Sequence, residues 1–368
     1  MPKFLPASLG HHAGRGLRTR PGPVPMSNGK VADLTGLRLT GRWGVTCADL
    51  GASVLAPNGR LVSVFGDTFS GRRVGRGDWR SPVVLIGTGD ADHVITYECA
   101  GGADPDYACQ LWHYVHDDAD ISTVIPSDLL RVDDSLYLHA IVNRGFGNVM
   151  WTEIWRSDDS GVTWANLGAT FPADLHGGYA QCWSWDCDPE DGWVYIVSTG
   201  FQRDKGIILR RVRPDHLGDA SQYSGWGYGD GRWRWGDAPT PITPAGETWG
   251  ELTFRRLAKG KWILGGFLSS NYALGYRVVD SPVANMHTTP IQIPIVGTAW
   301  SGEDHGQNKV AQLYGGYVLP GSRLDVEGGV GLVVSQWNTT VGWPYRAMQF
   351  KVTLKDTTKA MRPPQTNQ

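Results

Sequence analysis

Residues 157–164 read Ser-Asp-Asp-Ser-Gly-Val-Thr-Trp, and this stretch says more about the fold than any other. It fits the Asp-box pattern S-x-D-x-G-x-T-W, a β-hairpin turn in which Asp and Ser or Thr side chains bond the turn backbone while the Trp packs beneath. Such a turn is typical of a β-propeller blade, and here it directly follows the strand-like run MWTEIWR at 150–156. We therefore interpret Asp159 as a turn former and not as a catalyst.

Runs of alternating apolar residues around tight turns recur five times along the chain. Each run reads as two strands joined by a turn, and hairpin residues stand at 58–59 (Asn-Gly), 133–134 (Asp-Asp) and 190–192 (Glu-Asp-Gly). The hairpin starts are about 40–75 residues apart, near or above the repeat of propeller blades. We predict an all-β, five-bladed β-propeller. A β-sandwich is the alternative, because blade counting from hairpins alone is fallible.

Three segments follow from this interpretation. Residues 1–38 contain Gly, Pro and Arg without periodicity and are predicted to form a flexible arm. Residues 39–356 form the predicted propeller, and 357–368 form a tail. The arm has no continuous apolar stretch and does not read as a classical signal peptide. Any export would therefore have to take place in another way.

The composition argues against nucleic acid, membrane and metal as binding partners. The 368 residues include 34 Lys+Arg and 36 Asp+Glu, and the formal net charge of -2 gives no attraction to nucleic acid or to an anionic membrane. No run approaches the ~18 apolar residues of a membrane span. The five cysteines lack the paired spacing of a zinc site, and the sequence has neither an H-E-x-x-H metal motif nor a G-x-x-x-x-G-K-[ST] phosphate-binding loop, so we predict no metal and no cofactor. Cys99 and Cys109 bracket a loop that a disulfide could close in an oxidising environment.

The candidate catalysts are acids near expected blade starts, since propellers bind ligands at the mouth of the central channel. Asp49 stands at the first expected strand, Asp67 follows the partner strand, and Glu251 lies among apolar residues at the start of a later hairpin. Glycoside hydrolysis needs one carboxylic acid to protonate the leaving oxygen and one carboxylate to activate water or attack the anomeric carbon. The structural alternatives are a turn or strand cap for each Asp and an exposed strand position for Glu251.

Side chains that could bind a sugar form a second group. Indole rings stack on the C–H faces of sugars, and polar side chains bond their hydroxyl groups. The candidates are Asp186, Trp183, Trp249, Gln181, His113 and Trp337. Blade packing is the alternative interpretation for the Trp residues, and a structural role is the alternative for the His.

The ordered motifs together resemble a known family. They include CADLGASVLAPNGRLVSVFGDTFSG at 47–71, GWVYIVSTGFQRDKGIILRRV at 192–212 and WGELTF at 249–254. Their order is similar to that of the actinobacterial domain of unknown function 4185 family, treated as endo-D-arabinanases of glycoside hydrolase family 183. The resemblance implies a five-bladed propeller that cleaves the D-arabinan of cell-wall arabinogalactan and lipoarabinomannan. It also implies that Asp49 and Asp67 are the catalytic pair and that Glu251 matches a motif acid.

The motifs also resemble those of proteins from bacteriophages that infect actinobacteria. This resemblance implies an extracellular or virion-borne protein, with a tail-tip enzyme whose arm docks onto other tail proteins. Two further hypotheses remain open at this level. One is a carbohydrate-binding or host-receptor-recognition propeller without turnover, and the other is a purely structural virion protein.

Overall fold

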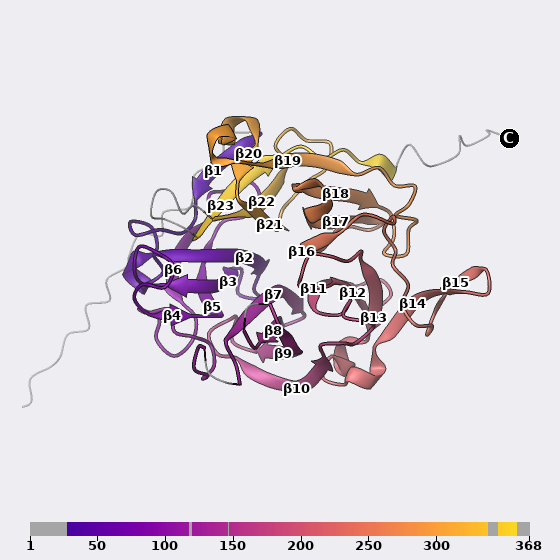
Figure 1. The fold of residues 1–368 in the computed structure, drawn as a ribbon, viewed down its shortest axis with the longest axis horizontal. Coiled ribbons are helices and arrows are strands. Elements are labelled where there is room, and N and C mark those ends of the chain that lie inside the picture. The colour runs from indigo at the N-terminus through magenta and orange to yellow at the C-terminus, as the bar shows by residue number, and fades with distance from the viewer. Residues whose placement is uncertain (1–27, 118–119, 146, 338–344, 359–368) are drawn as a thin grey trace, which may run out of the picture.

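Five β-sheets surround a central axis in the computed structural model, which describes residues 28–117, 120–145, 147–337 and 345–358 (Figure 1). The innermost strands of the sheets, β2, β7, β11, β16 and β21, contact one another around that axis. The predicted all-β, five-bladed propeller is confirmed, and the β-sandwich is excluded.

The blades are numbered along the chain. Blade 1 contains β2 (Cys47–Leu55), β3 (Leu61–Phe69), β4 (Trp79–Arg80), β5 (Val83–Thr88) and β6 (Thr96–Ala100). Blade 2 contains β7 (Thr123–Val132), β8 (Ser135–Asn143), β9 (Val149–Ser157) and β10 (Ala165–Pro172). Blade 3 contains β11 (Cys182–Asp188), β12 (Trp193–Thr199), β13 (Ile208–Val212), β14 (Ser224–Gly229) and β15 (Arg232–Trp235).

Blade 4 contains β16 (Trp249–Ala258), β17 (Lys261–Leu268), β18 (Ala273–Val279), β19 (Gln292–Thr298) and β20 (Lys309–Ala311). Blade 5 contains β21 (Leu313–Val318), β22 (Val330–Trp337), β23 (Tyr345–Val352) and β1 (Gly29–Asp33). Short 3-10 helices occur in the connections: η1 (Gly41–Trp43), η2 (Pro214–His216), η3 (Ala220–Gln222), η4 (Ser269–Asn271), η5 (Trp300–Gly302) and η6 (His305–Gln307). The pairs within the blades are antiparallel except β19 with β20.

The five predicted hairpins are the two inner strands of the five blades. At the first of them, Asn58 Oδ1 accepts the amide of Arg60 at 3.0 Å, and Gly59 takes a φ of 78° that suits its missing side chain. Local turn chemistry therefore closes the inner hairpin of blade 1.

The Asp box joins β9 to β10 and has the predicted structural role. Asp159 Oδ1 accepts the amides of Val162 and Thr163 at 3.1 and 2.8 Å, and Asp159 Oδ2 accepts the Thr163 hydroxyl at 2.6 Å. Trp164 Nε1 donates to the carbonyl of Gly161 at 3.1 Å. These bonds use both carboxylate oxygens of Asp159 inside the turn.

The ring closes by joining the two ends of the described chain. Strand β1 pairs with β23 as the outermost strand of blade 5. The predicted arm at 1–38 is therefore too long, since residues 29–33 belong to the propeller, and residues 1–27 lie outside the described residues. In the predicted tail, Thr357 donates to the carbonyl of Val278 at 3.1 Å, and residues 359–368 lie outside the described part.

Two other sequence predictions concern a possible disulfide between Cys99 and Cys109 and the lack of a membrane span. All five cysteines are free, so the loop between Cys99 and Cys109 is not closed by a disulfide in this structure. Among the described residues, no helix has the length and apolar character that crossing a membrane requires.

Candidate active site

A cavity of about 360 Å³ opens at one end of the central channel. Asp49 of β2, Thr123 of β7, Glu251 of β16 and Tyr314 of β21 line it, and all four lie near the beginnings of their inner strands. Asp67 also lines it, because β3 runs antiparallel to β2 and ends where β2 begins. The structure thus brings the three predicted catalytic acids to one hollow.

An irregular stretch of β2 sets the position of Asp49. The pairing register with β3 shifts on both sides of Leu50, and Leu50 adopts a φ of 64°, which is strained for a residue with a branched side chain. Gly51 follows with a φ of 109°, and a Cβ at this position would lie 2.8 Å from Val333. A Cβ on Gly66 would lie 2.4 Å from Asp49 Oδ1, so the carboxylate rests directly against that glycine.

Asp49 is buried with little compensation. The residue is 8% exposed. Its Oδ2 accepts a hydrogen bond from the Tyr314 hydroxyl at 3.3 Å, whereas its Oδ1 has no hydrogen-bond partner among the described residues. Burial, followed by the negative charges of Asp67 and Glu251, raises the pKa of Asp49 well above its usual value. A carboxylic acid that holds its proton in this way can act as a proton donor.

Asp67 has surroundings that suit the ionised form better. Its Oδ1 accepts hydrogen bonds from Trp79 Nε1 at 2.8 Å and from the Thr123 hydroxyl at 3.1 Å. Burial still raises the pKa of Asp67, while these two donors act in the opposite direction. The two aspartates are therefore close in space and unlike in hydrogen bonding.

Glu251 is held by a cation. Arg203 Nη2 donates to Glu251 Oε1 at 2.5 Å, whereas Oε2 is buried without a partner among the described residues. The carboxylate raises the pKa of Arg203. Arg203 lies in the loop after β12 with a φ of 60°, and its guanidinium carbon lies 5.5 Å from the ring centroid of Tyr314. The strained backbone at Arg203 thus holds its guanidinium at the cavity, where it pairs with Glu251.

Aromatic side chains form part of the cavity wall. Trp337 of β22 lines it and is 39% exposed, and its ring centroid lies 5.5 Å from that of Tyr345. Phe267 and Tyr272 line the cavity as well. These rings offer apolar faces beside the acids, an arrangement that suits sugar rings.

The structure does not place Trp183 and Trp249 in this cavity. Both are fully buried at 0% exposure, so they pack between blades as the structural alternative proposed. Trp183 stacks on His139 with 4.0 Å between ring centroids, and its Nε1 donates to the carbonyl of Ala180 at 2.8 Å. Their prediction as sugar-binding residues is wrong because alternation along a strand gives the face of a side chain but not what covers that face.

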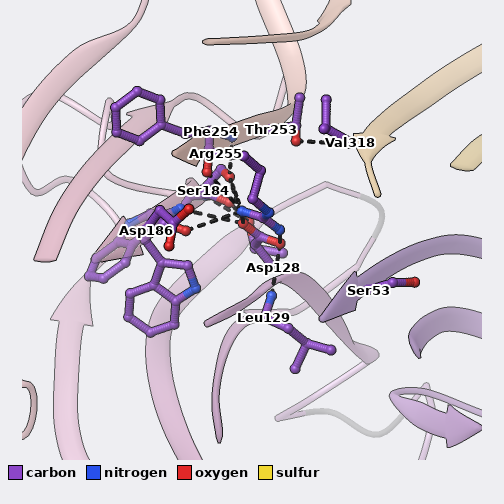
Figure 2. Close-up of polar contacts among 12 residues, drawn as sticks. Ser53, Asp128, Leu129, Ser184, Asp186, Thr253, Phe254, Arg255 and Val318 are labelled. Atoms are coloured by element: carbon purple, nitrogen blue, oxygen red, sulfur yellow. Dashed lines mark hydrogen bonds and ion pairs between the residues drawn. The ribbon is translucent and has the colours of Figure 1, made fainter. Parts of the chain in front are cut away.

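Asp186 lies at the opposite mouth of the channel, where the inner strands end, and lines a second cavity of about 580 Å³. Figure 2 shows it beside the polar contacts of Asp128 and Arg255. Asp186 accepts the amides of Cys187 and Arg256 at 2.8 and 2.7 Å, and burial raises its pKa to about 6. Beside it, Asp128 of β7 forms an ion pair with Arg255 of β16 at 2.5 Å. Asp186 therefore does not contribute to the cavity that holds Asp49.

Gln181 and His113 do not line the cavity either. Gln181 supports it indirectly, since its Oε1 accepts the amide of Phe201 at 3.0 Å and its Nε2 donates to Ala173 at 2.8 Å. Phe201 is a cavity residue in the same loop as Arg203. His113 is exposed in the connection between blades 1 and 2.

Sequence reasoning missed Arg203, Tyr314, Thr123 and Trp79 as site residues. Each contacts one of the three acids from another strand or loop, so no local spacing reveals it. Among the described residues, no group of three or more His, Cys, Asp or Glu side chains is arranged to hold a metal ion.

Solved structures share the fold. One is a putative hydrolase from Bacteroides ovatus with a TM-score of 0.56 and 13% identity, over 85% of this chain and 87% of that one. Another is a GH43_1 enzyme from Xanthomonas citri complexed with xylotriose, with a TM-score of 0.50 and 12% identity, over 83% of this chain and 87% of that one. At these identities the likeness concerns the fold alone.

Sequence relatives cover most of the chain. A protein of Mycolicibacterium smegmatis, called the uncharacterized 35.9 kDa protein in the asd 3' region, is 29% identical over 85% of this chain and 94% of its own length. Notoamide biosynthesis cluster protein J' of Aspergillus versicolor is 29% identical over 81% of this chain and 83% of its own. Residues 36–351 match the family described as Domain of unknown function (DUF4185), and the chain therefore belongs to that family.

Proposed function

We propose that the protein is an endo-acting glycoside hydrolase that cleaves the D-arabinan of actinobacterial cell walls. The observation that carries this proposal is the convergence of Asp49, Asp67 and Glu251 on one cavity in unlike surroundings. Acid and base roles in one site require carboxyl groups whose environments separate their proton affinities.

In this proposal the buried Asp49 gives its proton to the leaving glycosidic oxygen. Asp67, with two donors on Oδ1, acts as the carboxylate that takes a proton from the attacking water or attacks the anomeric carbon itself. Glu251, paired with Arg203, keeps a negative charge near Asp49 and favours its protonated form. Arg203 and Gln202 also offer donors to sugar hydroxyl groups at the wall.

Three observations support a polysaccharide as the substrate. A volume of about 360 Å³ falls in the usual range for ligand pockets. Aromatic rings line the wall, and one solved structure of the same fold is complexed with xylotriose. The choice of D-arabinan rests on the motif resemblance and on the 29% identity to a protein of Mycolicibacterium smegmatis over 85% of this chain.

The test is an assay of oligosaccharides released from purified arabinogalactan. Wild-type protein is expected to shorten the polymer, and Asp49→Asn and Asp67→Asn are each expected to lower the rate by about 10³-fold, within the span known for positioned acid–base groups. Chromatography of the products gives both the rate and the endo pattern.

Asp186→Asn is the matched control, because Asp186 is a shielded carboxyl at the other mouth of the same channel. It is expected to keep its rate within about two-fold of wild type. Wild-type protein that binds arabinan without releasing any product would instead support the binding propeller without turnover.

The virion setting stays a prediction from the resemblance. Mass spectrometry of purified virions would detect the chain among the tail proteins, and a gene outside any phage structural cluster would count against it.

A further inference from the structure

An unpaired arginine lies between blades 2 and 3. Arg210 of β13 is 1% exposed, and its Nε, Nη1 and Nη2 atoms are buried with no hydrogen-bond partner among the described residues. Removing a cation from water without a partner is very unfavourable. The ring centroids of Trp183 and Tyr223 lie 4.4 and 5.8 Å from its guanidinium carbon, but ring faces do not satisfy N–H donors at the edge of the guanidinium.

Other polar groups on the same face of blade 3 are also unpaired. Trp183 pairs with Ser198, and Ile196 pairs with both Trp185 and Arg210. Paired residues and alternate residues share a face of a sheet, so these side chains point the same way. Ser198 Oγ and Trp185 Nε1 are buried and have no partner among the described residues.

Blade 2 presents further unpaired groups to this face. His139 pairs with Ile154, and Ile141 pairs with Thr152, so His139 and Thr152 lie on one face of the blade. The ring of His139 stacks on Trp183, which shows that this face meets blade 3. Both ring nitrogens of His139 and the hydroxyl of Thr152 are buried without a partner among the described residues.

The chemistry of this set favours a negative ligand. Arg and Trp side chains only donate hydrogen bonds, and the hydroxyl groups and a neutral imidazole can donate as well. The nearby buried carboxylate, Asp128, already accepts from Arg255, Ser184 and the amide of Leu129. One water accepts about two hydrogen bonds and carries no charge, whereas an anion accepts several and offsets the arginine.

We propose that Arg210 binds a small inorganic anion, chloride, at the interface between blades 2 and 3. Thr152, Ser198 and His139 supply further donors to it. Because Arg210 is 1% exposed and the other side chains are 0% exposed, the site suits a monatomic ion rather than a larger organic anion. The ion joins two blades, and Ser198 lies in β12, which leads directly into the loop that carries Phe201 and Arg203. The proposal does not depend on the hydrolytic activity.

Crystals of the wild-type protein grown in bromide give the direct test. An anomalous difference peak at the bromine absorption edge, at hydrogen-bonding distance from Arg210, is the expected result. A site that holds only water, or no peak at all, would overturn the proposal.

Thermal unfolding in sodium chloride against sodium gluconate at equal ionic strength tests the ion in solution. Chloride is expected to raise the wild-type Tm by roughly 3–6 °C once its concentration is far above its Kd. Arg210→Met should abolish this difference, while Arg156→Met, at an exposed arginine of blade 2 paired with Asp158, should keep it.

If Arg210→Met does not fold, the wild-type measurements decide the matter. A bromide peak together with a chloride-dependent wild-type Tm supports a resident ion. A peak with no halide dependence of Tm indicates binding at crystal concentration only and overturns the proposal.

Discussion

The two mouths of the channel both hold shielded carboxyl groups, but they hold them differently. At one mouth, Asp49 Oδ1 and Glu251 Oε2 are buried without partners among the described residues. At the other, Asp128 accepts hydrogen bonds on both oxygens from Arg255, Ser184 and Leu129, and Asp186 accepts two backbone amides (Figure 2).

This difference shows that burial of an acid does not by itself mark a reactive site. Full hydrogen bonding fixes a carboxylate and ties strands together, as Asp128 does for β7, β11 and β16. Missing hydrogen bonds leave a carboxyl group strained and available to a ligand, as at Asp49. The mouth with unsatisfied oxygens is therefore the stronger candidate for chemistry.

The largest loss in the free energy of unfolding is expected at Asp128, because both of its carboxylate oxygens have hydrogen-bond partners. Asp128→Ala leaves Arg255 without its buried partner, and removal of one member of such a pair costs about 3–5 kcal/mol. Urea denaturation measures the loss in the free energy of unfolding. The double variant Asp128→Leu/Arg255→Met should recover part of it, and a single variant as stable as wild type would contradict the structural role of this mouth.

At the other mouth, Trp337→Ala is expected to weaken substrate binding. The exposed indole at the cavity wall can stack on a sugar, and loss of such a contact raises KM about ten-fold with kcat nearly unchanged. Steady-state kinetics on soluble arabinan fragments separates the two constants. Tyr228→Ala is the control, since Tyr228 is 54% exposed on β14 and does not line this cavity.

A stability gain is expected from Asp49→Asn. Burial and the neighbouring acids raise the folded-state pKa of Asp49 above the usual value of 3.8, so the folded state loses stability as pH rises through that raised pKa. Asparagine does not ionise, and the variant should be more stable than wild type by about 1 kcal/mol near pH 8. The gain should vanish below the unfolded value of 3.8.

Chemical denaturation across pH checks this sign. Asp159→Asn offers the contrast, because Asp159 uses both of its oxygens in the Asp box and should lose stability at the same pH. An Asp49→Asn protein that is less stable than wild type at high pH would contradict a raised pKa of Asp49 in the folded state.

The smallest effect concerns Tyr314→Phe. Burial is the largest cause of the raised pKa of Asp49, and the Tyr314 hydroxyl bond counteracts it. Without that hydroxyl the pKa of Asp49 rises further, so the alkaline limb of kcat/KM should move to higher pH. A shift to lower pH would argue against Asp49 as the proton donor.

The sequence by itself determined the parts of this protein that depend on local chemistry. Turn residues such as Asn58-Gly59 fix an inner hairpin through bonds within a few residues, and five such hairpins predicted the five blades. The Asp box at 157–164 fixes the β9–β10 turn in the same way and is itself typical of a propeller blade. Asp49 and Asp67 belong to one hairpin, so their convergence on one cavity also follows from a short-range pairing.

Tertiary structure alone decided the rest, because the mouth that a residue faces depends on its place along an inner strand. Asp49 is the third residue of β2 and Asp186 the fifth of β11, and this small difference places them at opposite ends of the channel. Several partners of the acids, including Arg203, Thr123 and Tyr314, come from other blades. Neither strand ends nor contacts between blades are encoded in local periodicity.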